Sequence, residues 1–165
     1  MKKVAVVMGS ASDLPLAKDA LKTLAAFDIP AAARVLSAHR TPDEAAAFAK
    51  SAEAEGYGAI IALAGKAAHL AGAMAAHSLL PVIGVPVSGK DLGGLDALLS
   101  TAQMPKGVPV ATVAIDGAAN AALLAVRILA LSDETVAAKL REYAQKLVEQ
   151  SAEADAAIQK ELEQL

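Results

Sequence analysis

Residues 4–13, VAVVMGSASD, decide the fold of this chain. The short apolar, mostly β-branched run at 4–8 is typical of a strand that is buried on both faces of a parallel sheet. Gly9 ends this run, and Pro15 lies in the first turn of the helical segment that follows. The stretch therefore predicts a strand, a tight loop and a helix, which is the opening unit of an α/β domain.

Similar apolar runs recur along the chain and alternate with longer segments of helical spacing. The predicted strands span residues 4–8, 32–36, 59–64, 82–87 and 108–115, and the predicted helices span 14–27, 43–55, 67–79 and 118–131. This alternation predicts a parallel sheet covered on both faces, a three-layer αβα sandwich of flavodoxin-like or Rossmann-like type. Ligands of such sheets bind beyond the carboxyl ends of the strands. The candidate site therefore comprises the loops that begin at Gly9, Ser37, Gly65 and Ser88.

Two segments depart from the alternation. Residues 88–107 are rich in glycine and predict a long loop around a short helix at 95–101. Residues 133–165 predict one long helix with apolar residues three and four apart, so we describe 1–165 as a single domain with a helical extension at 133–165. At about 1.5 Å per residue this helix outreaches the domain. We therefore favour packing on a neighbouring subunit, in a homo-oligomer, over packing on its own domain.

Composition narrows the function classes. The formal net charge is −3 and the chain has only two Phe and two Tyr, so a basic, aromatic surface for nucleic acid is not expected. The sequence has no cysteine, which excludes disulfides and fits a reducing compartment. No apolar run is long enough for a signal peptide or a membrane span. We expect a cytoplasmic protein with neither a nucleic acid nor a membrane as partner.

The loop after the first strand is a candidate phosphate site. Ser10 and Ser12 offer hydroxyl groups, and the following helix presents free N–H groups and the positive end of its dipole. Equally, Ser12 or Asp13 could simply cap that helix, and taken alone this second interpretation is the stronger one. The loop matches neither the dinucleotide pattern G-x-G-x-x-G nor a Walker motif with its lysine, so a dinucleotide or triphosphate is disfavoured.

The loop after the second strand is the strongest local signal. It follows Ser37 and places His39 beside Arg40, an imidazole that can move protons near neutral pH beside a guanidinium with a permanent charge. Thr41 or Asp43 could cap the next helix. A lone histidine is more often structural, but this pair at the carboxyl edge of a sheet indicates a functional site.

The loop after the third strand consists mainly of small residues. Residues 64–72, AGKAAHLAG, suit either a flat heterocycle lying against the wall or close packing of helix on sheet. His69 lies early in the helix that follows, and His77, eight residues later, is taken as structural. The loops provide too few His and carboxylate groups for a metal site, and no G-x-S-x-G nucleophile elbow is present.

Six motifs in order resemble the class I PurE family, the N5-carboxyaminoimidazole ribonucleotide mutases of purine biosynthesis. They are GSASD (9–13), SAHRTP (37–42), AGKAAHLAG (64–72), PVIGVPV (81–87), the stretch 94–115 and NAALLA (120–125), and the resemblance covers roughly residues 3–131. Several separate motifs make a chance match far less plausible than any one of them.

The resemblance implies a cofactor-free, metal-free isomerase that moves a carboxylate from the exocyclic nitrogen of an aminoimidazole ribotide to ring carbon C4, through trapped CO2. His39 would be the catalytic proton shuttle. The implied substrate contacts are Ser10, Ser12, Asp13, Ser37 and Arg40 for the phosphate and ribose, with Ala64, Gly65, His69 and Leu70 walling the base and the CO2. The family usually forms octamers.

Two residues depart from the class I pattern near the site. Lys66 stands where the pattern has glycine and Ala71 where it has proline, and both could alter the pocket. A positive φ at residue 66 would strain the loop. Two alternatives therefore stay open: a non-catalytic or redesigned oligomeric scaffold with the same fold, and a class II carboxylase that uses free CO2. Arg40 and His69 resemble class I rather than class II.

Overall fold

The computed structural model describes residues 1–163 and contains one parallel sheet. Its order is β2-β1-β3-β4-β5, with β3 at its centre and β1 paired to β2 and β3. The strands are β1 (Lys3–Met8), β2 (Ala31–Val35), β3 (Tyr57–Gly65), β4 (Val82–Val87) and β5 (Ala111–Thr112). The predicted five-stranded parallel sheet is therefore confirmed.

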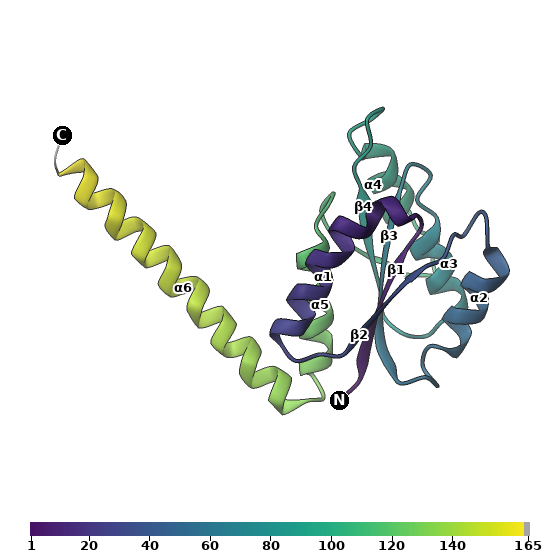
Figure 1. Ribbon diagram of the computed structural model, residues 1–165, viewed down its shortest axis with the longest axis horizontal. Helices are drawn as coiled ribbons and strands as arrows, with labels where there is room; N and C mark the ends of the chain where they lie inside the picture. Colours follow the sequence, from purple (N-terminus) through teal and green to yellow (C-terminus); the bar gives the residue numbers. More distant parts are fainter. Residues whose placement is uncertain (164–165) are drawn as a thin grey trace.

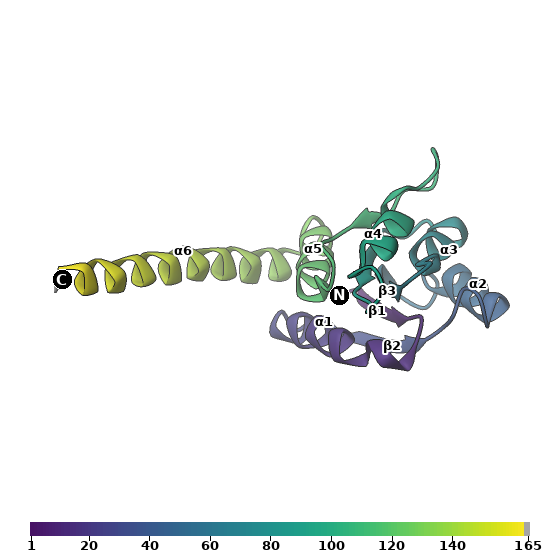
Figure 2. The ribbon, with the colours of Figure 1, turned by 90° about the horizontal axis from the view of Figure 1, so that it is seen from above.

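Helices cover both faces of the sheet. On one face lie α1 (Leu14–Ala26) and α5 (Ala118–Ala130), and on the other lie α2 (Pro42–Ser51), α3 (Leu70–His77) and α4 (Leu95–Ala102). Figure 2 shows α1 and α5 on one side of β1 and β3, with α2 and α3 on the other. The three-layer αβα sandwich is confirmed. No helix among residues 1–163 combines the length and the apolar character needed to cross a bilayer.

The alternation of side chains along β1 divides the core in two. Val4 and Val6 point to the layer of α1 and α5, whereas Ala5 and Val7 point to the layer of α2 and α3, and all four are fully buried. Alanines such as Ala125 line the helix surfaces that meet the sheet. The small side chains let the helices pack closely, which holds the strand ends in fixed positions.

Strand β5 is shorter than predicted. The chain still follows β4 beyond Thr112, because Val113 N donates to Gly84 O at 3.1 Å and Asp116 N to Pro86 O at 2.9 Å. Gly84 and Pro86 thus face this neighbour, and Pro86 has no N–H with which to continue the ladder. The prediction of a strand over 108–115 was therefore wrong at both ends, and the missing N–H of Pro86 accounts for the early carboxyl end.

Two helices also differ from their predicted bounds. The helix α3 begins at Leu70 rather than at residue 67, because Lys66 has a φ of +56° and His69 N donates to Ala67 O in a turn. It ends at His77, since Ser78 is extended. The helix α2 ends at Ser51 rather than at residue 55, where a turn leads to Gly56 with a φ of +87°.

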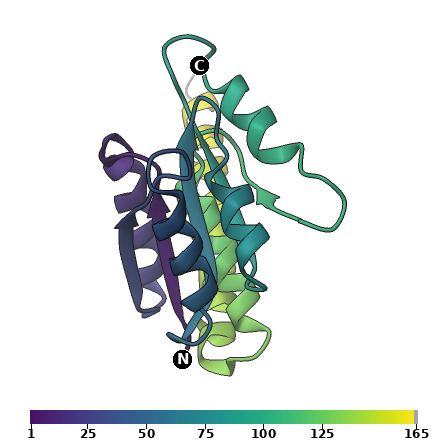
Figure 3. The same ribbon diagram turned by 90° about the vertical axis from the view of Figure 1, so that its right-hand side faces the viewer.

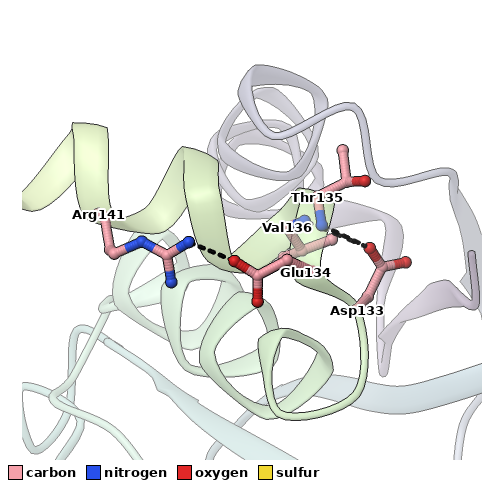
Figure 4. A network of polar contacts seen from close by, with 5 residues as sticks. All are labelled: Asp133, Glu134, Thr135, Val136 and Arg141. Carbon is pink, nitrogen blue, oxygen red and sulfur yellow. Dashed lines mark hydrogen bonds and ion pairs between the residues drawn. The ribbon is translucent and has the colours of Figure 1, made fainter.

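The last helix, α6 (Glu134–Leu162), is built as the sequence predicts. Asp133 caps it, since its carboxylate accepts from Thr135 N at 3.1 Å and from Val136 N at 3.3 Å. Figure 4 shows this cap together with the ion pair between Arg141 and Glu134. The predicted final residues, 164 and 165, lie outside the described part.

Only the first turns of α6 pack on the rest of the chain. Val136 is buried, Tyr143 meets Phe27 edge-on at 5.5 Å between ring centroids, and Lys139 forms an ion pair with Asp28. From residue 144 to 163 every residue is exposed. Figure 1 shows this part of α6 projecting away from the sheet. The chain's own body therefore covers only the beginning of the predicted apolar stripe.

Candidate functional site

A cavity of about 640 Å³ lies at the carboxyl edge of the sheet. Figure 3 shows the arrowheads of β1 and β2 pointing to this end of the molecule. The structure brings all ten predicted site residues together around the cavity: Ser10, Ser12, Asp13, Ser37, His39, Arg40, Ala64, Gly65, His69 and Leu70. His77, taken as structural, is exposed at the end of α3 and does not line it.

The loop after β1 is a short 3-10 turn capped by Ser10. Ser10 Oγ accepts from Ser12 N at 3.3 Å, whereas Asp13 makes no capping bond at the start of α1. The interpretation of Ser12 or Asp13 as the helix cap is therefore wrong. Their side chains contact each other instead, with Ser12 Oγ 3.1 Å from Asp13 Oδ1. Asp13 also lines the cavity.

Asp13 is the buried acid of the site. Asp13 is 7 % exposed, and this burial raises the pKa of its carboxyl above the usual value. Hydrogen bonds with the Ser12 side chain and the Ser10 backbone lower the pKa and oppose this effect. A buried, ionised carboxylate needs hydrogen-bond donors, which the hydroxyl groups of a ligand could supply.

The loop after β2 is held by its own side chains. Ser37 Oγ accepts from Arg40 N at 3.1 Å, and Ser37 N donates to Thr41 Oγ1 at 3.0 Å. Thr41 thus bonds within the loop, and it makes no side-chain cap for α2. Arg40 Nη2 donates to Gly9 O at 3.1 Å, which joins this loop to the loop after β1. The two loops form a continuous wall that presents His39 and Arg40.

His39 and His69 meet across the cavity. His39 Nε2 lies 2.7 Å from His69 Nδ1, and the two rings stand nearly perpendicular, at 87°. One nitrogen must carry the proton and the other must accept it. The sequence indicated both histidines but not this contact, because the two residues are thirty positions apart and meet only in the folded chain.

Of the two departures from the class I pattern, only one lies in the cavity wall. Lys66 lines the cavity and has the positive φ that would strain a lysine. Ala71 is buried in the α3 layer and is not among the lining residues. Lys66 is therefore the departure that bears on the site.

Several lining residues were not among the predicted site residues. They are Gly9, Ala38, Lys66, Ala67, Val87, Ser88 and Gly89. The loop that begins at Ser88 was indicated by its position after a strand, but nothing in its sequence singled out a residue. The wall as a whole combines Arg40 and Lys66 with Asp13 and two histidines, which suits an anionic ligand that carries hydroxyl groups.

The chain is similar to known proteins along most of its length. The sequence pattern of the AIR carboxylase family matches residues 3–150. An N5-carboxyaminoimidazole ribonucleotide mutase of Brucella melitensis is 55% identical over 152 residues, which cover 91% of this chain and 94% of that protein. Its namesake in Pyrococcus abyssi is 53% identical over 143 residues, covering 87% and 82%. The crystal structure of Treponema denticola PurE has a TM-score of 0.85 at 31% identity, covering 93% and 96%.

Proposed function

This chain belongs to the AIR carboxylase family, and on that premise we propose that it is an N5-carboxyaminoimidazole ribonucleotide mutase of purine biosynthesis. The reaction is an isomerisation in which the carboxylate leaves the exocyclic nitrogen and is joined to C4 of the imidazole ring. The observation that carries the proposal is the meeting of His39, Arg40 and Asp13, from two separate loops, at one cavity. The named relatives favour this activity over the carboxylase and the scaffold.

The cavity offers a distinct partner for each part of a ribotide. Arg40 and the positive dipole end of α1 suit the phosphate, because both favour an anion. The predicted free N–H groups are fewer than expected there, since Leu14 N donates to Ala11 O and Pro15 has no N–H. The Asp13 carboxylate suits the ribose hydroxyls as an acceptor, with Ser10, Ser12 and Ser37 as further polar contacts. The base then lies against the small-residue end of β3.

His39 performs the proton transfers of the proposed reaction. As the C–N bond of the carbamate breaks, its electron pair stays on nitrogen, CO2 is released, and His39 protonates that nitrogen. The ring carbon C4 then attacks CO2, and His39 removes the proton from C4. The proton that His39 gives to the nitrogen is replaced by the proton that it takes from C4, so the steps need no cofactor. His69, in contact with His39, orients the imidazole.

The apolar part of the wall retains the CO2. Ala64 lies at the end of β3, Ala67 lies on the loop after it, and Leu70, which is 2 % exposed, begins α3. Such side chains make no hydrogen bonds to water, so they favour a dry compartment beside the histidines. Recapture at C4 depends on that compartment, since CO2 that escapes is lost to the isomerisation.

Product analysis tests the proposal. The chain is incubated with the N-carboxylated ribotide and, separately, with aminoimidazole ribotide and CO2. We expect the C4-carboxylated product from the first substrate, and a loss of at least about a hundredfold in turnover for His39→Asn with an unchanged circular dichroism spectrum. Product from the second mixture alone would indicate a carboxylase. No product from either would indicate a scaffold.

We further propose a homo-oligomer, an octamer by resemblance, located in the cytoplasm. The exposed half of α6 supports an oligomer, since Leu147, Val148, Ile158 and Leu162 are each at least 49% exposed there. Leu92, Leu95 and Leu99 add exposed apolar surface around α4. The cysteine-free sequence suits a reducing compartment. Sedimentation of the full chain tests the assembly, and a monomer at micromolar concentration would contradict it.

A further inference from the structure

Lys66 holds an unusual backbone conformation in the cavity wall. Its φ is +56°, in the left-handed region that disfavours side chains with a Cβ. The other two non-glycine residues with positive φ among residues 1–163 are Asp28 and Asp116, and aspartate adopts this region more readily than lysine does. Strained residues gather at ligand sites, so the position of Lys66 calls for a functional explanation.

Lys66 also gives the cavity a second cation. Arg40 is bonded to the carbonyl of Gly9, which places it at the proposed phosphate end. Lys66 follows Gly65 at the end of β3 and precedes His69 by three residues, in the part of the wall that carries the histidine pair. The two cations thus come from different loops, and Lys66 comes from the loop that leads to His69.

The present partner of Lys66 is weakly held. Its Nζ lies 3.5 Å from Asp91 Oδ2, on the loop after β4, and the two side chains are 80% and 75% exposed. Solvent-exposed ion pairs of this kind contribute little and are screened by salt. A ligand anion in the cavity can therefore compete with Asp91 for the ammonium group.

We propose that Lys66 is a specificity-determining residue that binds the transferable carboxylate and so selects carboxylated imidazole ribotides over the uncarboxylated ribotide. The inference rests on the proposed function, whose substrate carries a phosphate at one end and a carboxylate at the other. Arg40 binds the phosphate, and Lys66 binds the carboxylate. The uncarboxylated ribotide has the phosphate alone, so it gains nothing from Lys66.

This role has a kinetic consequence. The carboxylate is an anion, whereas the CO2 formed from it is neutral, so an ammonium group stabilises the bound substrate more than it stabilises the state in which CO2 is free. Stabilisation of the ground state lowers KM without raising kcat. Lys66 therefore tightens binding and slows the chemical step.

The test compares the binding of two ligands by calorimetry, the C4-carboxylated ribotide and the uncarboxylated ribotide. Lys66→Gln keeps a side chain of nearly the same length on a backbone with positive φ but removes the charge. We expect it to weaken the carboxylated ligand about tenfold, as for the loss of one charge-assisted hydrogen bond, and to leave the uncarboxylated one unchanged within about twofold. Lys66→Arg, the matched control, should retain the preference. Lys66→Gln should also raise both KM and kcat.

Asp91→Asn is a second, independent test, because it removes the ion-pair partner of Lys66 without altering the proposed contacts of the ribotide. We expect it to tighten the carboxylated ligand about twofold at low salt and not to affect the other ligand. Equal weakening of both ligands by Lys66→Gln, or no change in either, would overturn the role of Lys66 while leaving the proposed function intact. If the unaltered chain bound neither ribotide, the proposed function would fall and the inference with it.

Discussion

His39 Nε2 and His69 Nδ1 lie 2.7 Å apart, with their ring planes at 87°. In this contact the two rings hold a single proton between the facing nitrogens, so the state of one ring fixes the tautomer of the other. The nitrogens that remain for other partners are Nδ1 of His39 and Nε2 of His69. The proposed proton shuttle is thus oriented by a neighbouring imidazole.

His69→Phe should lower kcat by about tenfold, the lower end of the effect known for removing the partner that orients a metal-bound histidine. The phenyl ring keeps the flat shape but has no nitrogen to meet His39. His69→Asn is the control, because its amide can place a hydrogen-bonding atom near the position of Nδ1. Steady-state kinetics with the N-carboxylated ribotide measure the difference. If the two variants had the same kcat, the contact would have no role in turnover.

Arg40→Met should raise KM for the ribotide by about ten- to a hundredfold, because a charge-assisted hydrogen bond to an anion is lost. Arg40→Lys keeps the charge but not the fork of donors, and it also loses the bond to Gly9 O. We expect the KM of Arg40→Lys to lie between that of the unaltered chain and that of Arg40→Met. Initial rates over a range of substrate concentrations test this order, and a higher KM in Arg40→Lys than in Arg40→Met would contradict it.

Asp13→Asn should stabilise the fold and weaken substrate binding. Burial raises the pKa of Asp13, so the ionised carboxylate opposes folding at neutral pH. The stability associated with the protonated group is complete below the unfolded-state pKa, about 3.9, and is lost as pH rises through the raised, folded-state value. The variant should therefore unfold at higher urea than the unaltered chain at pH 7, by a margin that disappears at acidic pH. A margin independent of pH would contradict burial as the cause.

Lys66→Gly should raise the free energy of unfolding by about 1 kcal/mol, since glycine adopts a φ of +56° without strain. Lys66→Ala is the matched control, because it removes the same side chain beyond Cβ but keeps the backbone penalty. Urea unfolding of both variants separates the two effects. Equal stability of the glycine and alanine variants would show that the backbone at residue 66 carries no strain.

The sheet and the edge that holds the cavity followed from the sequence because both depend on local patterns. Buried parallel strands are continuous apolar runs, and the residues that end them, such as Gly9 and Ser37, mark the carboxyl edge directly. The length of β5 did not follow, since it depends on the missing N–H of Pro86 on another strand. Ladder lengths are a property of pairs of strands.

Within the site, residue types were predictable and contacts were not. His39 and Arg40 were singled out by their chemistry and their place after a strand, whereas the bond from Arg40 to Gly9 and the meeting of His39 with His69 require the positions of three loops at once. The capping role went to Ser10 rather than to Ser12 or Asp13, because a 3-10 turn precedes α1. Lys66 was flagged by resemblance, but its φ came only from the structure.

The exposed half of α6 makes helical content a reporter of association. Residues 144–162 are held by no other part of the described chain, whereas most helical stability in proteins comes from the packing of an apolar face. The first turns of α6 are stabilised, because Asp133 caps the helix and Tyr143 packs on Phe27. On dilution below the dissociation constant of the proposed oligomer, the helix should fray from its C-terminal end toward Tyr143. Ellipticity at 222 nm would then fall with protein concentration while the sheet stays intact.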